Sequence, residues 1–132
     1  MSGATTGIGG RSGVVWAGVA LIAIVGLIHL IEGPEYLEGM TYVGVLFFLN
    51  AIGAAVSAYG IFRGRSWGWP LGVLIAAGAF VGYVLSRTVG LPGAPGLAQE
   101  SFFEPMGAAS LLVEALFVAL YAVGASRRTS TA

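Results

Sequence analysis

Four apolar stretches, each about long enough to cross a bilayer, constrain this chain more than any other feature of its sequence. A helix rises about 1.5 Å per residue, so about 20 apolar residues span the roughly 30 Å hydrocarbon core of a membrane. The stretches cover residues 14–31, 41–62, 67–89 and 107–125. They predict an all-α fold in which one domain, residues 14–125, forms a bundle of four transmembrane helices.

Composition also indicates that the lipid bilayer is the solvent of this protein. Hydrophobic residues make up 57% of the 132 residues and charged residues 9%, whereas a soluble domain carries roughly 25% charged residues. The 22 glycines suit transmembrane packing, because small residues let helix backbones approach closely. The absence of cysteine excludes disulfides, thiolate metal sites and thiol catalysis. The net charge of zero gives no reason to expect a nucleic-acid partner.

The segments that join the apolar stretches contain residues that end or kink helices. Gly33-Pro34 follows the first stretch and is expected to kink or end its helix, because proline removes a backbone donor. Arg63-Gly64-Arg65-Ser66 reads as a tight polar turn after the second stretch. Residues 90–105 carry Pro92, Pro95 and Pro105, so we expect an outer loop with a short turn at Phe102-Phe103.

The arginines are sorted to one side of the predicted bundle. Five of them fall on the side shared by both termini and the second connection, namely Arg11, Arg63, Arg65, Arg127 and Arg128. Positive charge favours the cytoplasmic side, so the pattern predicts a multi-pass protein of the cell membrane with both termini in the cytoplasm. Residues 1–13 would form a flexible cytoplasmic tail and residues 126–132 a basic one. The outer side then holds Glu32, Glu35, Glu38, Glu100 and Glu104, with Arg87 as its cation.

Glu114 is the ionisable residue placed deepest in a predicted span. It lies seven residues into the fourth stretch, roughly 10 Å below the outer boundary. Ionisable groups at such depth are costly and usually face the bundle interior beside a partner. We expect Glu114 to be ionised, because Arg87 and His29 reach the same half of the bundle.

Several other polar residues share that half. His29 and Glu32 are three residues apart and lie on one helix face, and Glu35 continues the series. Asn50 is about midway along the second span, where an amide commonly bridges helices. The predicted polar cluster comprises His29, Glu32, Glu35, Asn50, Arg87, Glu104, Ser110 and Glu114.

Imidazole and carboxylate groups are ligands for zinc, iron and manganese. His29, Glu32, Glu104 and Glu114 are therefore candidate ligands for a divalent metal ion. The alternatives without a functional role are that the loop glutamates are solvated and that Arg87 extends to the lipid headgroups as an anchor. The chain has no HExxH, GxSxG or phosphate-loop motif and no second histidine, so zinc protease, serine hydrolase and NTPase activities have no support.

Three tracts resemble a known family: HLIEGPEYLEG at 29–39, SRTVGLPG at 86–93 and EPMGAASLLVE at 104–114. Together they resemble a family of small four-helix membrane proteins from high-GC bacteria and halophilic archaea, over about residues 26–118. The resemblance implies the four-helix fold, and it implies no activity. It also implies that one site contains His29, Glu32, Glu35, Arg87, Glu104 and Glu114.

The preferred functional hypothesis is a membrane binding or accessory protein whose polar cluster holds a proton or a divalent metal ion. Its expected surroundings are the lipid bilayer and either further copies of itself or a larger membrane complex. One alternative is an oligomeric ion or proton-coupled transporter with Glu114 as the carrier. Another is a carboxylate-metal oxidoreductase. Binding is preferred to catalysis because the sequence shows no catalytic motif.

Overall fold

The fold is a bundle of four long helices. The computed structural model describes the backbone of residues 2–93 and 95–131 and the side chains of residues 13–93 and 95–124. The helices are α1 (Ser2–Gly39), α2 (Thr41–Phe62), α3 (Gly68–Thr88) and α4 (Pro105–Thr131), and a short 3-10 helix, η1 (Pro95–Gln99), precedes α4. Each long helix contains a segment long and apolar enough to cross a membrane. The predicted all-α four-helix transmembrane fold is therefore confirmed.

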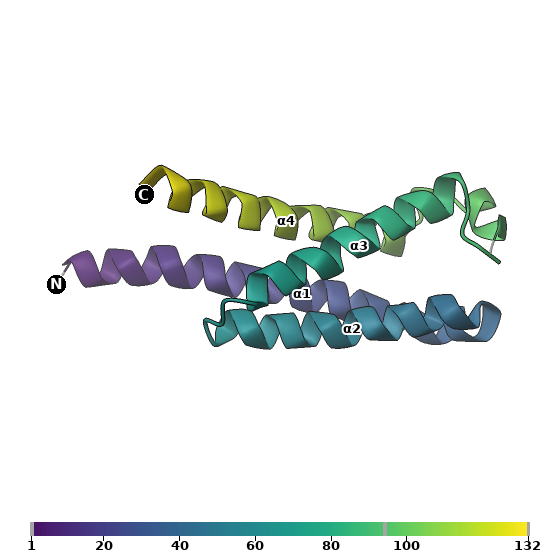
Figure 1. Ribbon diagram of the computed structural model, residues 1–132, viewed down its shortest axis with the longest axis horizontal. Coiled ribbons are helices and arrows are strands. Elements are labelled where there is room, and N and C mark those ends of the chain that lie inside the picture. The colour runs from purple at the N-terminus through teal and green to yellow at the C-terminus, as the bar shows by residue number, and fades with distance from the viewer. Residues whose placement is uncertain (1, 94, 132) are drawn as a thin grey trace.

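The helices pack in chain order around a ring. α1 packs along α2, α2 against α3, α3 against α4, and α4 returns to α1. Figure 1 shows that α3 is inclined to α2, so that the two helices separate along the bundle. We call the end with the α2–α3 turn, which carries Arg63 and Arg65, the arginine end. The opposite end, with the α1–α2 connection and residues 89–104, is the glutamate end.

Helix α1 extends further than the apolar stretch predicted. It continues through Pro34 to Gly39, and Met40 alone separates it from α2. The expected helix end at Gly33-Pro34 is therefore absent, although the proline still removes the backbone hydrogen bond to the Leu30 carbonyl. Close packing on α2 holds this last part of α1 in place, because a Cβ on Gly44 would lie 2.4 Å from the backbone of Leu37.

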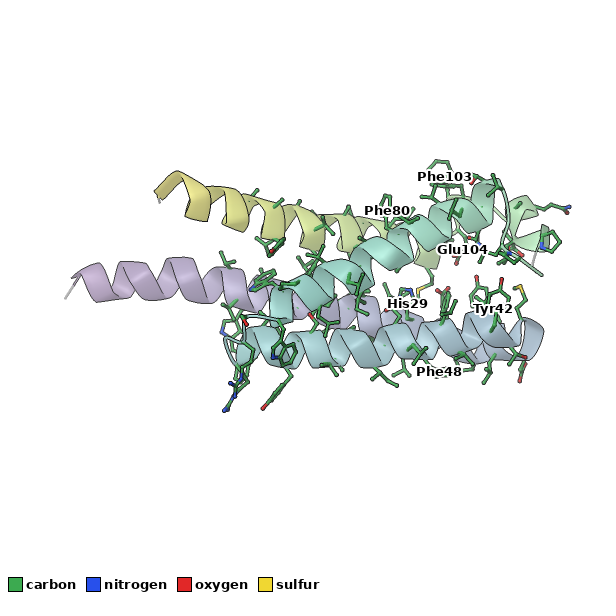
Figure 2. The ribbon with its side chains drawn as sticks, in the orientation of Figure 1. His29, Tyr42, Phe48, Phe80, Phe103 and Glu104 are labelled. Carbon is green, nitrogen blue, oxygen red and sulfur yellow. The ribbon has the colours of Figure 1, made fainter. Side chains whose placement is uncertain are left out.

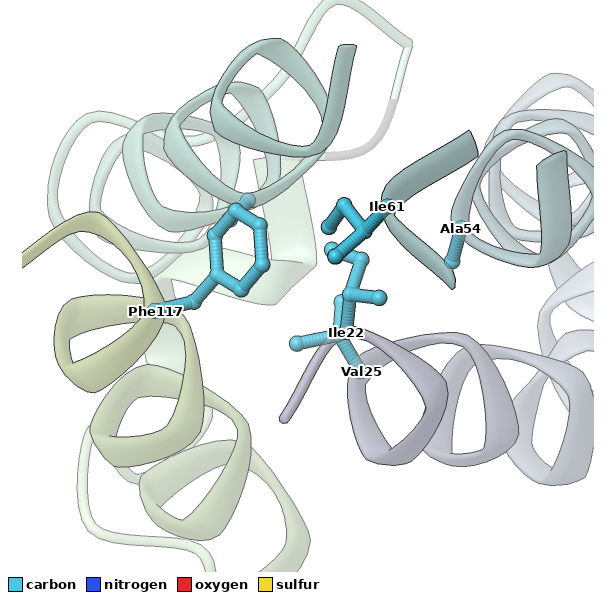
Figure 3. Packing of buried hydrophobic residues seen from close by; sticks show 6 residues of the cluster. Ile22, Val25, Ala54, Ile61 and Phe117 are labelled. Atoms are coloured by element: carbon cyan, nitrogen blue, oxygen red, sulfur yellow. The ribbon is translucent and has the colours of Figure 1, made fainter. Parts of the chain in front are cut away.

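A dry apolar core fills the bundle between its middle and the arginine end. Its residues are all at most 2% exposed: Ile22, Val25, Ala54, Ile61, Ala76 and Phe117. Figure 3 shows the Phe117 ring of α4 facing Ile22 of α1 and Ile61 of α2. Trp69 stacks on Phe117 with ring centroids 5.3 Å apart. Phe117 lies one turn beyond Glu114 on the same face of α4, so this core lies directly beneath Glu114.

Residues 89–104 cover the glutamate end of the bundle. Gly90 ends α3 with a φ of 83°, a left-handed conformation that favours glycine, and its N–H bonds to the Leu85 carbonyl at 2.9 Å. The hydroxyl of Tyr42 on α2 donates to the Pro92 carbonyl, which ties the segment to the bundle. Leu97 of η1 is buried. A turn follows at 102–103.

The predicted tails, residues 1–13 and 126–132, fall largely outside the residues whose side chains are described. Their mobility stays a prediction, and so do the positions of the side chains of Arg11, Arg127 and Arg128.

Candidate functional site

The glutamate-end half of the bundle contains a cavity of about 350 Å³. This volume is at the lower end of the range for small-molecule sites, roughly 300–1,000 Å³. The walls are mostly apolar, and the polar residues among them come from all four long helices: His29, Glu32, Tyr36, Asn50, Tyr83, Ser86, Arg87, Ser110 and Glu114. In the view of Figure 2, the side chain of His29 on α1 lies between α2 and α3.

Glu114 of α4 lines the cavity. Its side chain is 1% exposed, and its Oε2 accepts a hydrogen bond of 2.7 Å from the hydroxyl of Ser110 one turn away. Its Oε1 has no hydrogen-bond partner in the protein. Phe117 of the apolar core follows one turn further along α4.

Arg87 is held in the wall nearer the glutamate end. Its guanidinium stacks on the ring of Tyr83, 4.6 Å from the centroid, and donates to the Ser86 hydroxyl at 3.2 Å and to the Tyr36 hydroxyl at 3.4 Å. The side chain is 8% exposed, so Arg87 does not extend outward as a headgroup anchor. Within the described residues, no carboxylate oxygen lies within 4 Å of this guanidinium. Arg87 therefore forms no ion pair with Glu114 or Glu104.

His29 and Asn50 complete the interior. The Nδ1 of His29 is 2.8 Å from the Val25 carbonyl, so in a neutral ring Nδ1–H donates and Nε2 remains an acceptor. The ring packs on Phe47 with centroids 4.8 Å apart. Asn50 donates weakly from Nδ2 to the Ile75 carbonyl at 3.4 Å, which bridges α2 to α3 as expected for an amide at this depth.

Three buried polar atoms lack a hydrogen-bond partner in the described part of the protein: Asn50 Oδ1, Arg87 Nε and Glu114 Oε1. They belong to α2, α3 and α4, and all three residues line the same cavity. An unsatisfied buried group costs about 1–3 kcal/mol. Each of the three atoms is enclosed by other atoms of the protein, so the bundle itself carries this cost in stability.

Two residues of the predicted cluster lie elsewhere. Glu104 is the N-cap of α4, where its carboxylate accepts hydrogen bonds from the backbone N–H of Met106 at 3.2 Å and of Gly107 at 2.8 Å. Such a cap satisfies backbone donors and is worth about 1 kcal/mol. Glu35 is exposed on α1 and does not line the cavity.

The four candidate metal ligands are not brought together. Among the described residues, no group of three or more His or Glu side chains is arranged to hold a metal ion. His29, Glu32 and Glu114 line the cavity, whereas the oxygens of Glu104 bond to the start of α4. The residues present therefore do not fit a divalent metal centre in this arrangement.

Tyr36, Tyr83 and Ser86 belong to the site but were not predicted. Tyr36 lies seven residues after His29, which is nearly the same helix face, and Tyr83 lies one turn before Arg87. The hydroxyl of Tyr83 also donates to the Phe102 carbonyl at 2.9 Å. The sequence feature that identifies the two tyrosines is their helical spacing, of Tyr36 from His29 and of Tyr83 from Arg87.

The cavity opens toward the lipid between α2 and α3. Four of its lining residues are exposed, Leu46 and Leu49 of α2 and Leu74 and Gly78 of α3. Leu91 and Leu97 line its outer end and belong to the covering segment 89–104. The arrangement thus defines a small, amphiphilic cavity inside a four-helix membrane bundle.

Comparisons of the chain with models of protein families, with curated proteins and with solved structures found no match. The resemblance to the small four-helix family stays a prediction.

Proposed function

We propose that this protein is a membrane binding protein that holds a small organic molecule in the cavity at its glutamate end. The observation that carries the proposal is the cavity itself, which has a volume of about 350 Å³, mostly apolar walls and polar side chains from all four long helices. A mostly apolar cavity with a few convergent polar groups is the usual form of a small-molecule site.

An organic ligand suits this cavity better than a bare metal ion. A volume of about 350 Å³ is many times that of one water, about 30 Å³, and the walls between the polar atoms are apolar. A metal site would instead need several donor atoms converging at about 2.0–2.2 Å from one point. The proposal keeps a binding role for the polar cluster, but the proposed ligand is an organic molecule instead of the predicted cation.

The cavity also supports binding rather than conduction. A transporter with Glu114 as carrier needs a route from this residue to the arginine end. Phe117, Ile22 and the rest of the dry core occupy that part of the bundle. The transporter alternative therefore draws no support from the packing of the described residues, and the oxidoreductase alternative draws none from the placement of its candidate metal ligands among them.

The proposal predicts that polar residues of the cavity are kept for binding at a cost in stability. Glu114→Met removes an unsatisfied oxygen and introduces an apolar side chain of similar length. We expect the ligand-free variant to be as stable as the wild type or more stable by about 1 kcal/mol. We also expect it to lose an organic molecule that accompanies the wild-type protein through purification.

The measurement is mass spectrometry of solvent extracts of each purified protein, with thermal unfolding and metal analysis of the same samples. Glu35→Met is the matched control, because Glu35 is exposed and outside the cavity. About one molecule per chain in wild type and Glu35→Met, and none in Glu114→Met, is the expected result. Stoichiometric metal without an organic molecule, or neither in any sample, would overturn the proposal.

We propose further that both termini are cytoplasmic and that the bilayer is the cell membrane. Arg63 and Arg65 lie at the arginine end, and the N-terminal end of α1 and the C-terminal end of α4 lie at that end too (Figure 1). Lys and Arg concentrate on the cytoplasmic side of membrane proteins. A reporter fused after residue 132 should be active in the cytoplasm, and an extracytoplasmic signal would reverse this orientation. Self-association through glycine-rich helix faces, or assembly into a larger complex, belongs to the same proposal.

A further inference from the structure

We propose that the arginine end of the bundle is a docking surface for anionic phospholipids. The negative headgroup would lie against Arg63 and Arg65 in the α2–α3 turn, and the acyl chains would pack on the aromatic side chains beside that turn. This surface and the cavity lie at opposite ends of the bundle, so lipid binding here and the binding of a molecule in the cavity can be tested separately.

Positive charge in the turn is not balanced by acidic side chains. Neither α2 nor α3 contains an aspartate or a glutamate, and none occurs in residues 1–31 or 115–132. Arg63 and Arg65 are exposed, and within the described residues neither guanidinium has a hydrogen bond or an ion pair. Exposed arginines beside a membrane are attracted to anionic lipids. The charge of the turn is therefore free to attract an anion from outside the protein.

The backbone of the turn has a fixed conformation. Gly64, between the two arginines, has a φ of 70°, in the left-handed region that favours glycine. The N–H of Gly64 bonds to the Ile61 carbonyl at 3.1 Å, and the N–H of Arg65 bonds to the Gly60 carbonyl at 2.8 Å. These two bonds form the Schellman pattern of a helix end. Because the backbone that carries Arg63 and Arg65 is already ordered, less entropy is lost when a headgroup binds.

Aromatic side chains flank the turn in the sequence. Phe62 precedes Arg63 and contacts Trp16 of α1, with ring centroids 5.7 Å apart. Trp67 follows the turn, and its ring lies against α2, where a Cβ on Gly60 would be 2.6 Å away from it. All three aromatic residues are exposed. Tryptophan is enriched where lipid chains meet headgroups, so an apolar surface at that depth adjoins the two positive charges.

The combination of charge and aromatic surface favours an anionic lipid over other anions. A free phosphate would use the arginines and leave the aromatic rings uncovered, and an acidic protein would have to enter the lipid chains to cover them. An anionic phospholipid supplies both a phosphate, which guanidinium groups bind well, and chains that contact the rings. A zwitterionic lipid has the same chains, but its ammonium group cancels the charge of its phosphate. Phosphatidylglycerol should therefore bind more tightly than phosphatidylcholine.

The test uses brominated lipids, which quench tryptophan fluorescence when their chains contact the indole ring. The chain has three tryptophans, and all lie at this end: Trp16 contacts Phe62 at the end of α2, and Trp67 and Trp69 are at the start of α3. The full-length protein is placed in dioleoylphosphatidylcholine vesicles with equal fractions of brominated phosphatidylglycerol or brominated phosphatidylcholine. We expect a relative binding constant at least about threefold higher for phosphatidylglycerol.

Arg63→Gln combined with Arg65→Gln tests the two charges. This pair should lower the ratio of the binding constants to about one, while quenching by brominated phosphatidylcholine and the thermal midpoint stay as in the wild type. Arg63→Lys combined with Arg65→Lys keeps the charges and should keep the preference. Glu35→Gln combined with Glu38→Gln is the matched control, because it removes two exposed charges at the glutamate end and should leave the preference unchanged.

Equal quenching by the two brominated lipids in the wild type would overturn the proposal. A wild-type preference in the glutamine pair would also overturn it, because the charge of the turn would then play no part. Loss of the preference in the lysine pair would show that charge does not carry it. Loss on addition of inorganic phosphate at constant ionic strength would identify a free anion instead of a lipid. The molecule expected in wild type and absent from Glu114→Met is measured independently, so the proposed function stands or falls on that result.

Discussion

Replacing Phe117 by alanine is expected to lower the free energy of unfolding by about 3 kcal/mol, at the lower end of the range for Phe→Ala in a protein core. Phe117 is fully buried and packs on Trp69 and against Gly72. The unfolded chain remains in apolar surroundings within a micelle or bilayer, so the loss is chiefly one of packing contacts rather than of transfer from water.

The measurement is equilibrium unfolding in mixed detergent micelles, followed by circular dichroism. Leu112→Ala is the control, because Leu112 lies on the same helix and is 61% exposed. It should change the free energy of unfolding by less than about 0.5 kcal/mol. Equal effects of the two substitutions would show that the Phe117 core does not hold the bundle together.

Gly44→Ile is expected to cost about 3 kcal/mol, near the top of the usual range for overpacking. A Cβ at Gly44 would lie 2.4 Å from the backbone N and Cα of Leu37. Backbone atoms cannot rotate aside, so α1 and α2 would have to separate. That movement would also displace Tyr36, whose hydroxyl accepts a hydrogen bond from Arg87.

Gly39→Ile provides the comparison for this second substitution. Gly39 lies in the same hairpin, but a Cβ there meets no atom within 4 Å. The same unfolding experiment should show a large loss for Gly44→Ile and a small change for Gly39→Ile. A loss of similar size in both would indicate that isoleucine disturbs the hairpin by its own backbone preference rather than by contact.

The predicted cluster shows how helical geometry decides membership of the site. The interpretation of His29, Glu32 and Glu35 as one series used a spacing of three residues. At about 100° per residue, each such step turns by about 60° away from the starting face. Glu35 is therefore about 120° from His29 and lies outside the cavity, whereas Tyr36 is about 20° from His29 and lines it.

Glu104 caps a helix instead of joining the polar cluster. Its position immediately before Pro105 matches the pattern of a cap followed by proline at the first helical position. A carboxylate there gains hydrogen bonds from the backbone and a favourable interaction with the helix dipole. Both of its oxygens bond to the start of α4. The capping pattern around Glu104 therefore decides where its carboxylate lies.

The length and hydropathy of its segments determine by themselves that this chain forms four membrane-crossing helices, because bilayer thickness and backbone hydrogen bonding permit little else. They also place Glu114 within a span. The tertiary structure alone decides that Arg87 packs on Tyr83 rather than pairing with Glu114, and that α2 and α3 leave an opening. These outcomes depend on the rotation and crossing of helices, which are fixed by contacts between residues distant in sequence, such as Gly72 with Phe117. A hydropathy pattern carries no information about such contacts.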